Sequence, residues 1–497
     1  MKKLFFLSVL ASAALGLHAF APISIIPAPR EMKLTGGESV FNGKINCETV
    51  ASIPEEGYEL SITKEKGVTV RASTEKGRFY ARTTLLHIAC RYEKADGKKY
   101  YPCLEIKDAP KYKWRGVQLD DARHHFGKET VKRLLEQMSW YKYNVFHWHL
   151  TEDQCWTLDI PGYPELNKWS MTRDRMPAHG ARRDETVADG QYGPCRYTAA
   201  DLKEIVAFAA KRHITVVPEI EVPGHTMAAL CAYPQFACNP DEILNKWHRK
   251  PPIWCAGVYK DVLCVGNPEA IQFFEKVFDY VCDIFPSKVI HIGGDECPSV
   301  SWKTCPKCQA LMKREGIPSE KELQAWVTRH FTEYLAKKGR RVIGWDEIFK
   351  GGEVPKTTIG MYWRAGSPEG LKAVNKGYDI VACPTSHCYF DYKQGLPEDP
   401  FQYIGGNLPI TRVYQFDPLK GVAPEHQCHV LGGECENWSS HTWNRFDLEW
   451  KLWPRGMALA EALWTAPEKR DFAEFSARAE EHRRRLIKVK INCAPLK

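Results

Sequence analysis

Three features are missing from this sequence of 497 residues. Beyond residue 17 there is no run of 18 apolar residues, so no later segment is long enough to cross a bilayer as a helix, and we expect no transmembrane anchor. Basic residues exceed acidic ones only by 69 to 61 and form no stripe, so we expect no nucleic-acid partner. A composition of 44% hydrophobic and 26% charged residues excludes a disordered chain and is typical of a globular protein.

The N-terminus has the pattern of an export signal. Lys2 and Lys3 precede an apolar stretch over residues 4–17, and small residues follow, with a plausible cleavage site after Ala19. The apolar stretch is too short to span a bilayer comfortably. We therefore expect residues 1–19 to be a signal peptide and the mature chain to be exported, into a periplasm or out of the cell.

The remaining chain divides into two unequal parts. Residues 22–108 contain short strand-like runs at 60–62 and 68–72 and a helical pattern over 77–92, which predicts a small α+β domain. From residue 109 to 497, apolar strands alternate with amphipathic helices, which predicts an α/β fold, a (β/α)8 barrel of the TIM type with C-terminal helices. The candidate strands are residues 116–120, 145–150, 215–220, 289–293, 341–345, 358–363, 379–383 and 430–434. The clearest helical patterns are residues 129–141, 199–212, 268–285 and 319–338.

Residues able to do chemistry follow seven of these eight strands. Any one of them alone is explained as well by a helix cap or a surface acid, but in a barrel the carboxyl ends of the strands meet at one mouth, where active sites lie. The fourth strand ends in two glycines and the adjacent acids Asp295 and Glu296. Two carboxylates with different roles, beside aromatic residues at neighbouring strand ends, are what cleavage of a glycosidic bond requires.

The sequence resembles the β-N-acetylhexosaminidases of glycoside hydrolase family 20. The resemblance covers roughly residues 110–465, and the family also has a small α+β domain before its barrel. The matching segments, in the family's order, are residues 120–124 (DDARH), 144–150 (NVFHWHL), 223–226 (PGHT), 291–296 (HIGGDE), 344–347 (GWDE) and 453–455 (WPR).

This resemblance implies a retaining, exo-acting enzyme that removes terminal β-linked GlcNAc or GalNAc through an oxazolinium intermediate, with no cofactor. Glu296 would be the general acid and base, and Asp295 would orient the 2-acetamido group and stabilise its positive charge. Tyr389 would bind the acetamido oxygen, while His225 and Asp153 would tune Glu296; Glu152, beside Asp153, is an alternative for that role. The residues implied in sugar binding are Arg123, Trp345, Trp363, Asp391 and Trp438.

The sequence departs from the family at one position. Where the family has Trp-x-Glu after the eighth strand, this chain has Trp438, Ser439 and Ser440, so a carboxylate that binds sugar hydroxyls is replaced by a hydroxyl. Either Glu436 or His441 substitutes for it, or discrimination at O4 and O6 of the sugar is altered.

Two other functions fit parts of the pattern. His147 and His149 point to the same side of one strand and, with His225, would suit a metal-dependent barrel amidohydrolase. That motif normally ends the first strand, whereas here it ends the second. The Ser440 change also fits a catalytically idle protein that binds N-acetyl sugars, although both acids and Tyr389 are retained.

Eighteen cysteines complete the pattern, and in an exported chain they favour disulfides. Cys297, Cys305 and Cys308 follow the acidic pair with the spacing C-x7-C-x2-C. The preferred interpretation is one or two disulfides that hold a long loop. The alternative is a structural zinc site with a fourth ligand from Cys238, Cys255 or Cys264.

Overall fold

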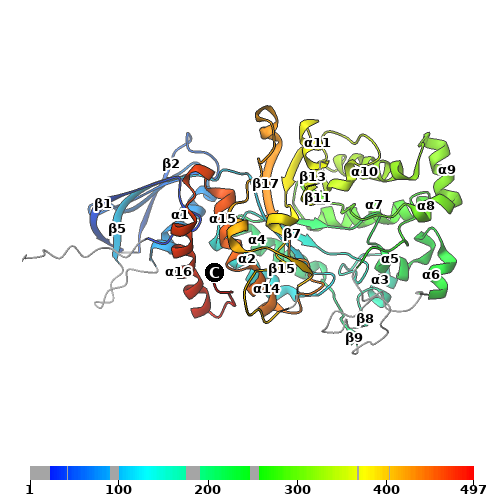
Figure 1. Ribbon diagram of the computed structural model, residues 1–497, viewed down its shortest axis with the longest axis horizontal. Coiled ribbons are helices and arrows are strands. Elements are labelled where there is room, and N and C mark those ends of the chain that lie inside the picture. The colour runs from blue at the N-terminus through cyan, green and yellow to red at the C-terminus, as the bar shows by residue number, and fades with distance from the viewer. Residues whose placement is uncertain are drawn as a thin grey trace, which may run out of the picture.

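The computed structural model describes residues 23–41, 43–89, 100–174, 191–246, 257–366, 369–401 and 403–496. The expected signal peptide over residues 1–19 and the candidate ligand Cys255 lie outside these ranges. An N-terminal sheet occupies one end of the elongated molecule, and a closed barrel with its helices occupies the rest (Figure 1).

The N-terminal part is a five-stranded sheet with one helix. The strands lie in the order β1-β5-β3-β4-β2, antiparallel except for the pair β2 and β4. The two predicted strands and the predicted helix are present as β3, β4 and α1, and three further strands complete the sheet. The elements are β1 Glu31–Val40, β2 Ile45–Thr49, β3 Tyr58–Thr63, β4 Gly67–Ala72, α1 Glu75–Ala89 and β5 Tyr100–Asp108.

All eight strands predicted from the alternating pattern close into one parallel barrel. Their order is β10-β11-β12-β13-β14-β17-β6-β7, so each predicted strand pairs with its neighbours in sequence and the last pairs with the first. The (β/α)8 prediction is therefore confirmed. The strands are β6 Trp114–Asp120, β7 Val145–His149, β10 Thr215–Glu219, β11 Val289–His291, β12 Arg341–Trp345, β13 Ile359–Tyr362, β14 Asp379–Ala382 and β17 Val430–Cys435.

The four clearest predicted helices are present within two residues of their expected ends as α2, α4, α7 and α10. In α4, Thr198 and Asp201 form a reciprocal capping box; in α7, Asn267 caps the helix and Pro268 takes its first position. The helices that follow β6, β7, β10, β11 and β13 are α2 Gly127–Trp140, α3 Pro164–Trp169, α4 Ala199–Ala210, α5 Met227–Ala232, α6 Pro240–Lys246, α7 Pro268–Ile284, α8 Val300–Thr304, α9 Pro306–Glu315, α10 Glu320–Ala336 and α11 Glu369–Asn375. The later ones are α12 Thr385–Cys388, α13 Ile410–Tyr414, α14 Arg445–Leu452, α15 Arg455–Trp464 and α16 Phe472–Lys488.

Short elements complete the description. Two-stranded ladders are formed by β8 Arg173–Asp174 with β9 Gln191–Tyr192 and by β15 Tyr392–Lys393 with β16 Gly405–Asn407. Single 3-10 turns are η1 Pro234–Phe236, η2 Asp346–Phe349, η3 Pro424–His429 and η4 Pro467–Lys469.

A buried ion pair joins the small domain to the barrel. Lys142, just before β7, lies 3.1 Å from the carboxylate of Asp108 at the end of β5, and both side chains are inaccessible to solvent. The ammonium of Lys142 also lies 4.4 Å from the ring centre of Trp464 in α15, and Trp464 donates a hydrogen bond to Asp108. Helix α16 packs beside this junction, since its His482 contacts both His87 of α1 and Tyr141 (Figure 1).

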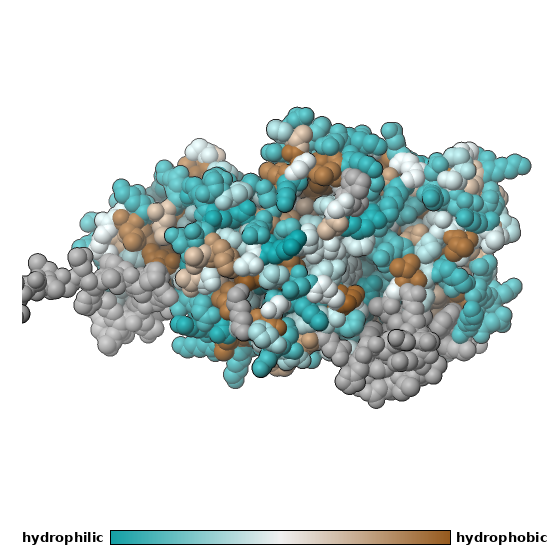
Figure 2. All heavy atoms as spheres, in the orientation of Figure 1, coloured by the Kyte–Doolittle hydropathy of each residue, from teal (hydrophilic) through white to brown (hydrophobic). Residues whose placement is uncertain are grey.

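The visible face of the molecule is mainly hydrophilic, and hydrophobic residues are scattered among polar ones (Figure 2). Within the described residues, no helix has both the length and the apolar character needed to cross a membrane.

The junction generates a stability prediction. Lys142→Met leaves the Asp108 carboxylate buried without its cation, so we expect the free energy of unfolding to fall by about 3–5 kcal/mol. Chemical denaturation measures this change. Lys132→Met is the matched control, because Lys132 pairs with the half-exposed Glu204 at the surface and should hardly alter stability. Equal losses in both variants would contradict the account of the junction.

Candidate active site

A cavity of about 340 Å³ opens at the barrel mouth, where the carboxyl ends of the strands meet. Its volume lies at the lower end of the range for small-ligand pockets. Eight of the ten side chains proposed from the sequence line this cavity: Arg123, Asp295, Glu296, Trp345, Trp363, Tyr389, Asp391 and Trp438. The other two, His225 and Asp153, lie directly behind the acidic pair.

The backbone before the acidic pair is fixed by two glycines. Strand β11 ends at His291, two residues earlier than predicted, because Gly293 and Gly294 have φ angles of 63° and 93°. A Cβ on Gly293 would collide with the carboxylate of Glu221, and one on Gly294 would lie 2.6 Å from Ile348. The two glycines therefore make room for neighbouring protein side chains.

The two acids differ in environment. The side chain of Asp295 is 15% exposed, and that of Glu296 is 42% exposed. Burial raises the pKa of Asp295 to about 7, whereas contact with His225 lowers the pKa of Glu296. Glu296 also has a left-handed backbone, with φ of 45°, which is costly for a residue other than glycine and is common at functional sites.

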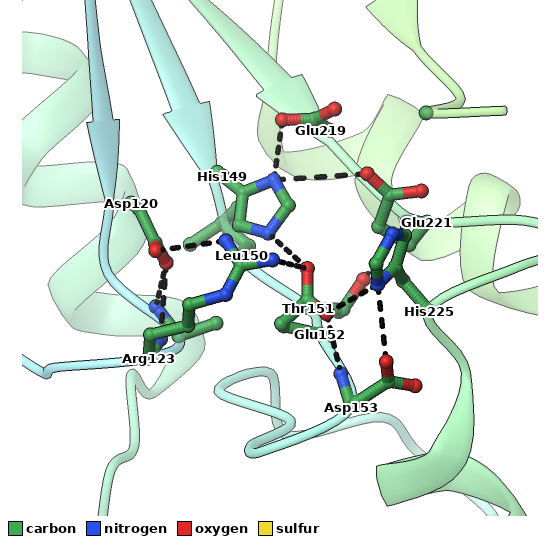
Figure 3. Close-up of polar contacts among 12 residues, drawn as sticks. Asp120, Arg123, His149, Leu150, Thr151, Glu152, Asp153, Glu219, Glu221 and His225 are labelled. Carbon is green, nitrogen blue, oxygen red and sulfur yellow. Dashed lines mark hydrogen bonds and ion pairs between the residues drawn. The ribbon is translucent and has the colours of Figure 1, made fainter. Parts of the chain in front are cut away.

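His225 connects the acidic pair to two further carboxylates. Its Nε2 lies 3.7 Å from both Asp295 Oδ2 and Glu296 Oε2. On the other side of the ring, its Nδ1 lies 2.7 Å from Glu152 and 3.0 Å from Asp153 (Figure 3). Burial alone would lower the pKa of His225, but Glu152 and Asp295 hold it well above its usual range. The imidazole is therefore a buried cation that faces both members of the pair.

Glu152 has more partners than Asp153. Besides His225, it contacts Arg123 Nη2 at 2.9 Å and His149 Nε2 at 3.1 Å (Figure 3). Asp153 contacts His225 and accepts a hydrogen bond from the backbone N–H of Met227. The sequence left Asp153 and Glu152 as alternatives for tuning Glu296 through His225. Both carboxylates contact the imidazole, and Glu152 also connects it to Arg123 in the pocket wall.

Four of the aromatic side chains in the pocket wall pack in two pairs. The Trp345 and Trp438 rings pack with their centres 5.6 Å apart, and the Trp363 and Tyr389 rings stack at 6.1 Å. Trp345 donates a hydrogen bond of 2.8 Å to Glu219 at the end of β10. Trp363 donates one of 3.0 Å to Glu347, which follows β12. These bonds fix the ring planes, so the wall is preformed.

Arg123 and Asp391 supply opposite charges to the pocket. Arg123 lies 3.1 Å from Asp120 and 2.9 Å from Glu152, and its guanidinium is 5.1 Å from the Trp438 ring centre. The Asp391 carboxylate is buried, has no hydrogen-bond partner on either oxygen, and burial raises its pKa to about 7. A buried acceptor of this kind is costly unless a ligand satisfies it.

Ser440 lines the pocket, but its two proposed substitutes do not. Glu436 is completely buried in the barrel interior, where the neighbouring Glu434 adds to the effect of burial in raising its pKa. His441 is absent from the pocket wall, and its backbone carbonyl accepts a hydrogen bond from Lys451. Neither side chain lies in the wall in place of the family's carboxylate, whereas Asp391 lines the same pocket as Ser440.

The His-x-His motif serves a buried ion-pair network. His147 lies 2.7 Å from Glu434 and 3.1 Å from Glu219, and His149 lies 2.5 Å from Glu219. Burial alone would raise the pKa of Glu219, but the surrounding imidazoles hold it well below its usual range. His225 contacts Glu152 and Asp153 through its own Nδ1, so each of these three histidines is paired with buried carboxylates.

The cysteine expectations need two corrections. Within the described residues, no pair of cysteines forms a disulfide. Cys297 is separate from the other cysteines proposed with it: its Cβ packs near Gly224, beside His225, whereas Cys305 and Cys308 group with Cys238 and Cys264. The linear spacing after Glu296 therefore misidentified one member of the group.

Several residues at the site were not identified from the sequence. Glu219 and Glu347 orient Trp345 and Trp363, and Thr385, Tyr392 and Ile404 add to the pocket wall. Glu219 and Glu347 both lie at strand ends that the sequence pattern had marked. The three wall residues follow β14 in a segment of very short elements, α12, β15 and β16, which have no periodic pattern, so no signal identified them.

This fold and pocket define a glycoside hydrolase with a (β/α)8 catalytic barrel. Family models described as "Glycosyl hydrolase family 20, catalytic domain" and "Glycosyl hydrolase family 20, domain 2" match residues 112–467 and 42–109. The chain belongs to glycosyl hydrolase family 20.

Individual relatives agree with this assignment. A β-hexosaminidase of Porphyromonas gingivalis is 38% identical over 88% of this chain, which spans only 54% of that protein's length. A β-hexosaminidase of Akkermansia muciniphila is 31% identical, over 97% of this chain and 94% of that protein. A GH20 exo-β-N-acetylglucosaminidase from Vibrio harveyi, solved with N-acetylglucosamine, superposes with a TM-score of 0.83 at 27% identity, covering 95% of this chain and 78% of that one.

The position of His225 predicts a shift in pH dependence. His225→Gln removes the cation that lowers the pKa of both Glu296 and Asp295, so both pKa values rise. We expect both limbs of the pH profile of kcat/KM to move to higher pH. His330→Gln is the control and should leave the profile unchanged, because His330 pairs with Glu275 of α7 and not with the acidic pair. A profile unaltered by His225→Gln would show that the imidazole does not carry the charge assigned to it.

Proposed function

We propose that this protein is an exo-acting, retaining β-N-acetylhexosaminidase that removes terminal, non-reducing β-linked GlcNAc or GalNAc. The observation that carries the proposal is the pairing of Asp295 with Glu296 at the rim of an aromatic pocket sized for a small ligand. The names of the relatives support the same substrate class.

The proposed chemistry uses the substrate's own 2-acetamido group as nucleophile. Its carbonyl oxygen attacks the anomeric carbon while Glu296 gives its proton to the leaving oxygen, which produces an oxazolinium ion. Glu296 then removes a proton from water, and the water oxygen attacks the anomeric carbon from the face opposite to the acetamido oxygen. This attack opens the oxazolinium ring and restores the original configuration at the anomeric carbon. No cofactor is needed for these steps, because nucleophile, acid and base are all supplied by the substrate and the chain.

In the free protein the pKa shifts favour the opposite proton states: the lowered pKa of Glu296 favours its anion, and the raised pKa of Asp295 favours its neutral form. The Glu296 carboxyl is half-exposed, so a bound glycoside that excludes water from it would raise its pKa and favour the acid form. Positive charge that develops on the acetamido nitrogen would lower the pKa of Asp295 and favour its anion. Each acid is thus driven toward its working state by the substrate itself.

A second cavity adjoins the aromatic pocket and has room for the leaving group. It has a volume of about 910 Å³ and shares Glu296 and Trp363 with the aromatic pocket. In the proposed binding mode the terminal sugar fills the aromatic pocket, and the rest of the glycan lies in this second cavity. Together with the expected signal peptide, this arrangement supports an exported enzyme that trims glycan ends.

The test of this function is the requirement for the acetamido group. We expect rapid hydrolysis of a chromogenic β-N-acetylglucosaminide and little hydrolysis of the matching β-glucoside, which differs only at C2. Equal turnover of the two would contradict substrate assistance. Binding of the acetamido sugar without any hydrolysis would instead identify a catalytically idle protein.

Glu296→Gln should leave substrate binding largely intact and slow turnover of an oligosaccharide by roughly 10²–10⁴-fold, the usual contribution of a general acid. An aryl glycoside with a low leaving-group pKa needs less protonation and should lose less. The ratio of the two losses, measured at saturating substrate, checks the role. A near-normal rate on the oligosaccharide would exclude Glu296 as the acid.

Asp295→Asn keeps the shape of the side chain and removes its charge. Because that charge acts mainly on the transition state, kcat should fall roughly 10²–10³-fold, or about 3–4 kcal/mol, with a smaller change in KM. A helix-capping role is already excluded, since the next helix, α8, begins at Val300. Normal kcat with a lowered melting temperature would contradict the assignment.

A further inference from the structure

Four cysteines from three separate segments converge in the region behind the catalytic loop. Cys238 follows η1, Cys264 precedes α7, and Cys305 and Cys308 lie at the start of α9. Their sulfur atoms all lie within 4.8 Å of one another, and all four side chains are buried. These four described cysteines are close enough together for their sulfur atoms to bind one metal ion.

The distances between the sulfur atoms decide which bond they form. The Cys264–Cys305 distance is 3.5 Å, and Cys308 lies 3.8 Å from both Cys264 and Cys238. A disulfide requires about 2.05 Å. A tetrahedral zinc ion with Zn–S bonds of about 2.3 Å places its sulfur ligands about 3.8 Å apart. The geometry points to a structural Zn²⁺ site formed by Cys238, Cys264, Cys305 and Cys308.

The local backbone supports four closely spaced thiolates. Cys305 precedes the first residue of the ten-residue helix α9, and Cys308 lies in its first turn, where the helix dipole favours negative charge. A Cβ on Gly266 would collide with the backbone of Lys307, so a glycine is required for the Cys264 segment to approach α9 this closely. The Cys264 N–H also donates a hydrogen bond of 2.8 Å to Phe236, two residues before Cys238.

The proposed zinc site holds together two loops that carry residues of the active site. The N–H of Leu263, next to Cys264, donates to the carbonyl of Pro223, two residues before His225. Cys305 ends the segment that leaves the barrel at Asp295 and Glu296. A metal here therefore joins the loop after β10 to the loop after β11. Its role is structural, because none of its four ligands lines the aromatic pocket.

The test is the metal content of the purified full-length chain. We expect about one zinc per chain, resistant to dialysis. Once the metal is extracted under denaturing conditions, the four cysteines of the site should all be reactive, free thiols. Growth with Co²⁺ should give protein with the intense visible bands of tetrahedral cobalt thiolate. These measurements need no variant, so they remain decisive if substitution prevents folding.

Variants then locate the site. Cys308→Ser should reduce zinc to near zero and lower the melting temperature, whereas Cys282→Ser, on α7 and outside the group, should retain zinc and stability. Two disulfides among the four would overturn the proposal, and the mass of the denatured chain would reveal them as a loss of two hydrogens per bond. Four free thiols without metal would overturn it as well. Neither result would alter the acetamido test of the catalytic function.

Discussion

The site depends on a continuous network of buried carboxylates and imidazoles in the barrel interior. From Trp345 the contacts run through Glu219 and His149 to Glu152, and from there to His225 and the acidic pair. Figure 3 shows the central part of this network, from Glu219 to His225. Burying so many charges is costly, and the cost is offset only because each charge has a partner. Removal of one charged side chain leaves its partner buried without a counter-charge, so the network allows a single arrangement of these side chains. That arrangement fixes the positions of the pocket wall and of the acidic pair.

This constraint explains the backbone around it. The carboxylate of Glu221 lies so close to Gly293 that any side chain there would displace it, and the left-handed residues Gly294 and Glu296 follow directly. The strain at Glu296 is held by the packed segments on either side. The same region is flanked by the four-cysteine group, so the catalytic loop is anchored at its start by the barrel and near its end by the proposed metal.

Much of the barrel was predictable because its signal is local. Strands buried on both faces read as short apolar runs, as in β12 and β14, and the mouth was marked by polar residues after seven of the eight runs. Strand β1 was missed because eight of its ten residues are exposed and Gly36 and Gly37 interrupt its apolar alternation. The partners of Glu219 come from three different strands, β7, β11 and β12. The four cysteines come from three separate segments, and only the tertiary fold places Cys264 rather than Cys297 beside Cys305.

The central claim is that the acetamido oxygen of the substrate is the nucleophile, with Asp295 and Glu296 as its supports. The most direct test is kcat/KM for aryl β-glucosaminides whose N-acetyl group carries none, one, two or three fluorine atoms. Fluorine withdraws electrons from the carbonyl oxygen and hardly changes its size, so the account predicts a steep, progressive loss of kcat/KM along the series. A rate that is independent of fluorine content would contradict it and would assign the nucleophile to the enzyme.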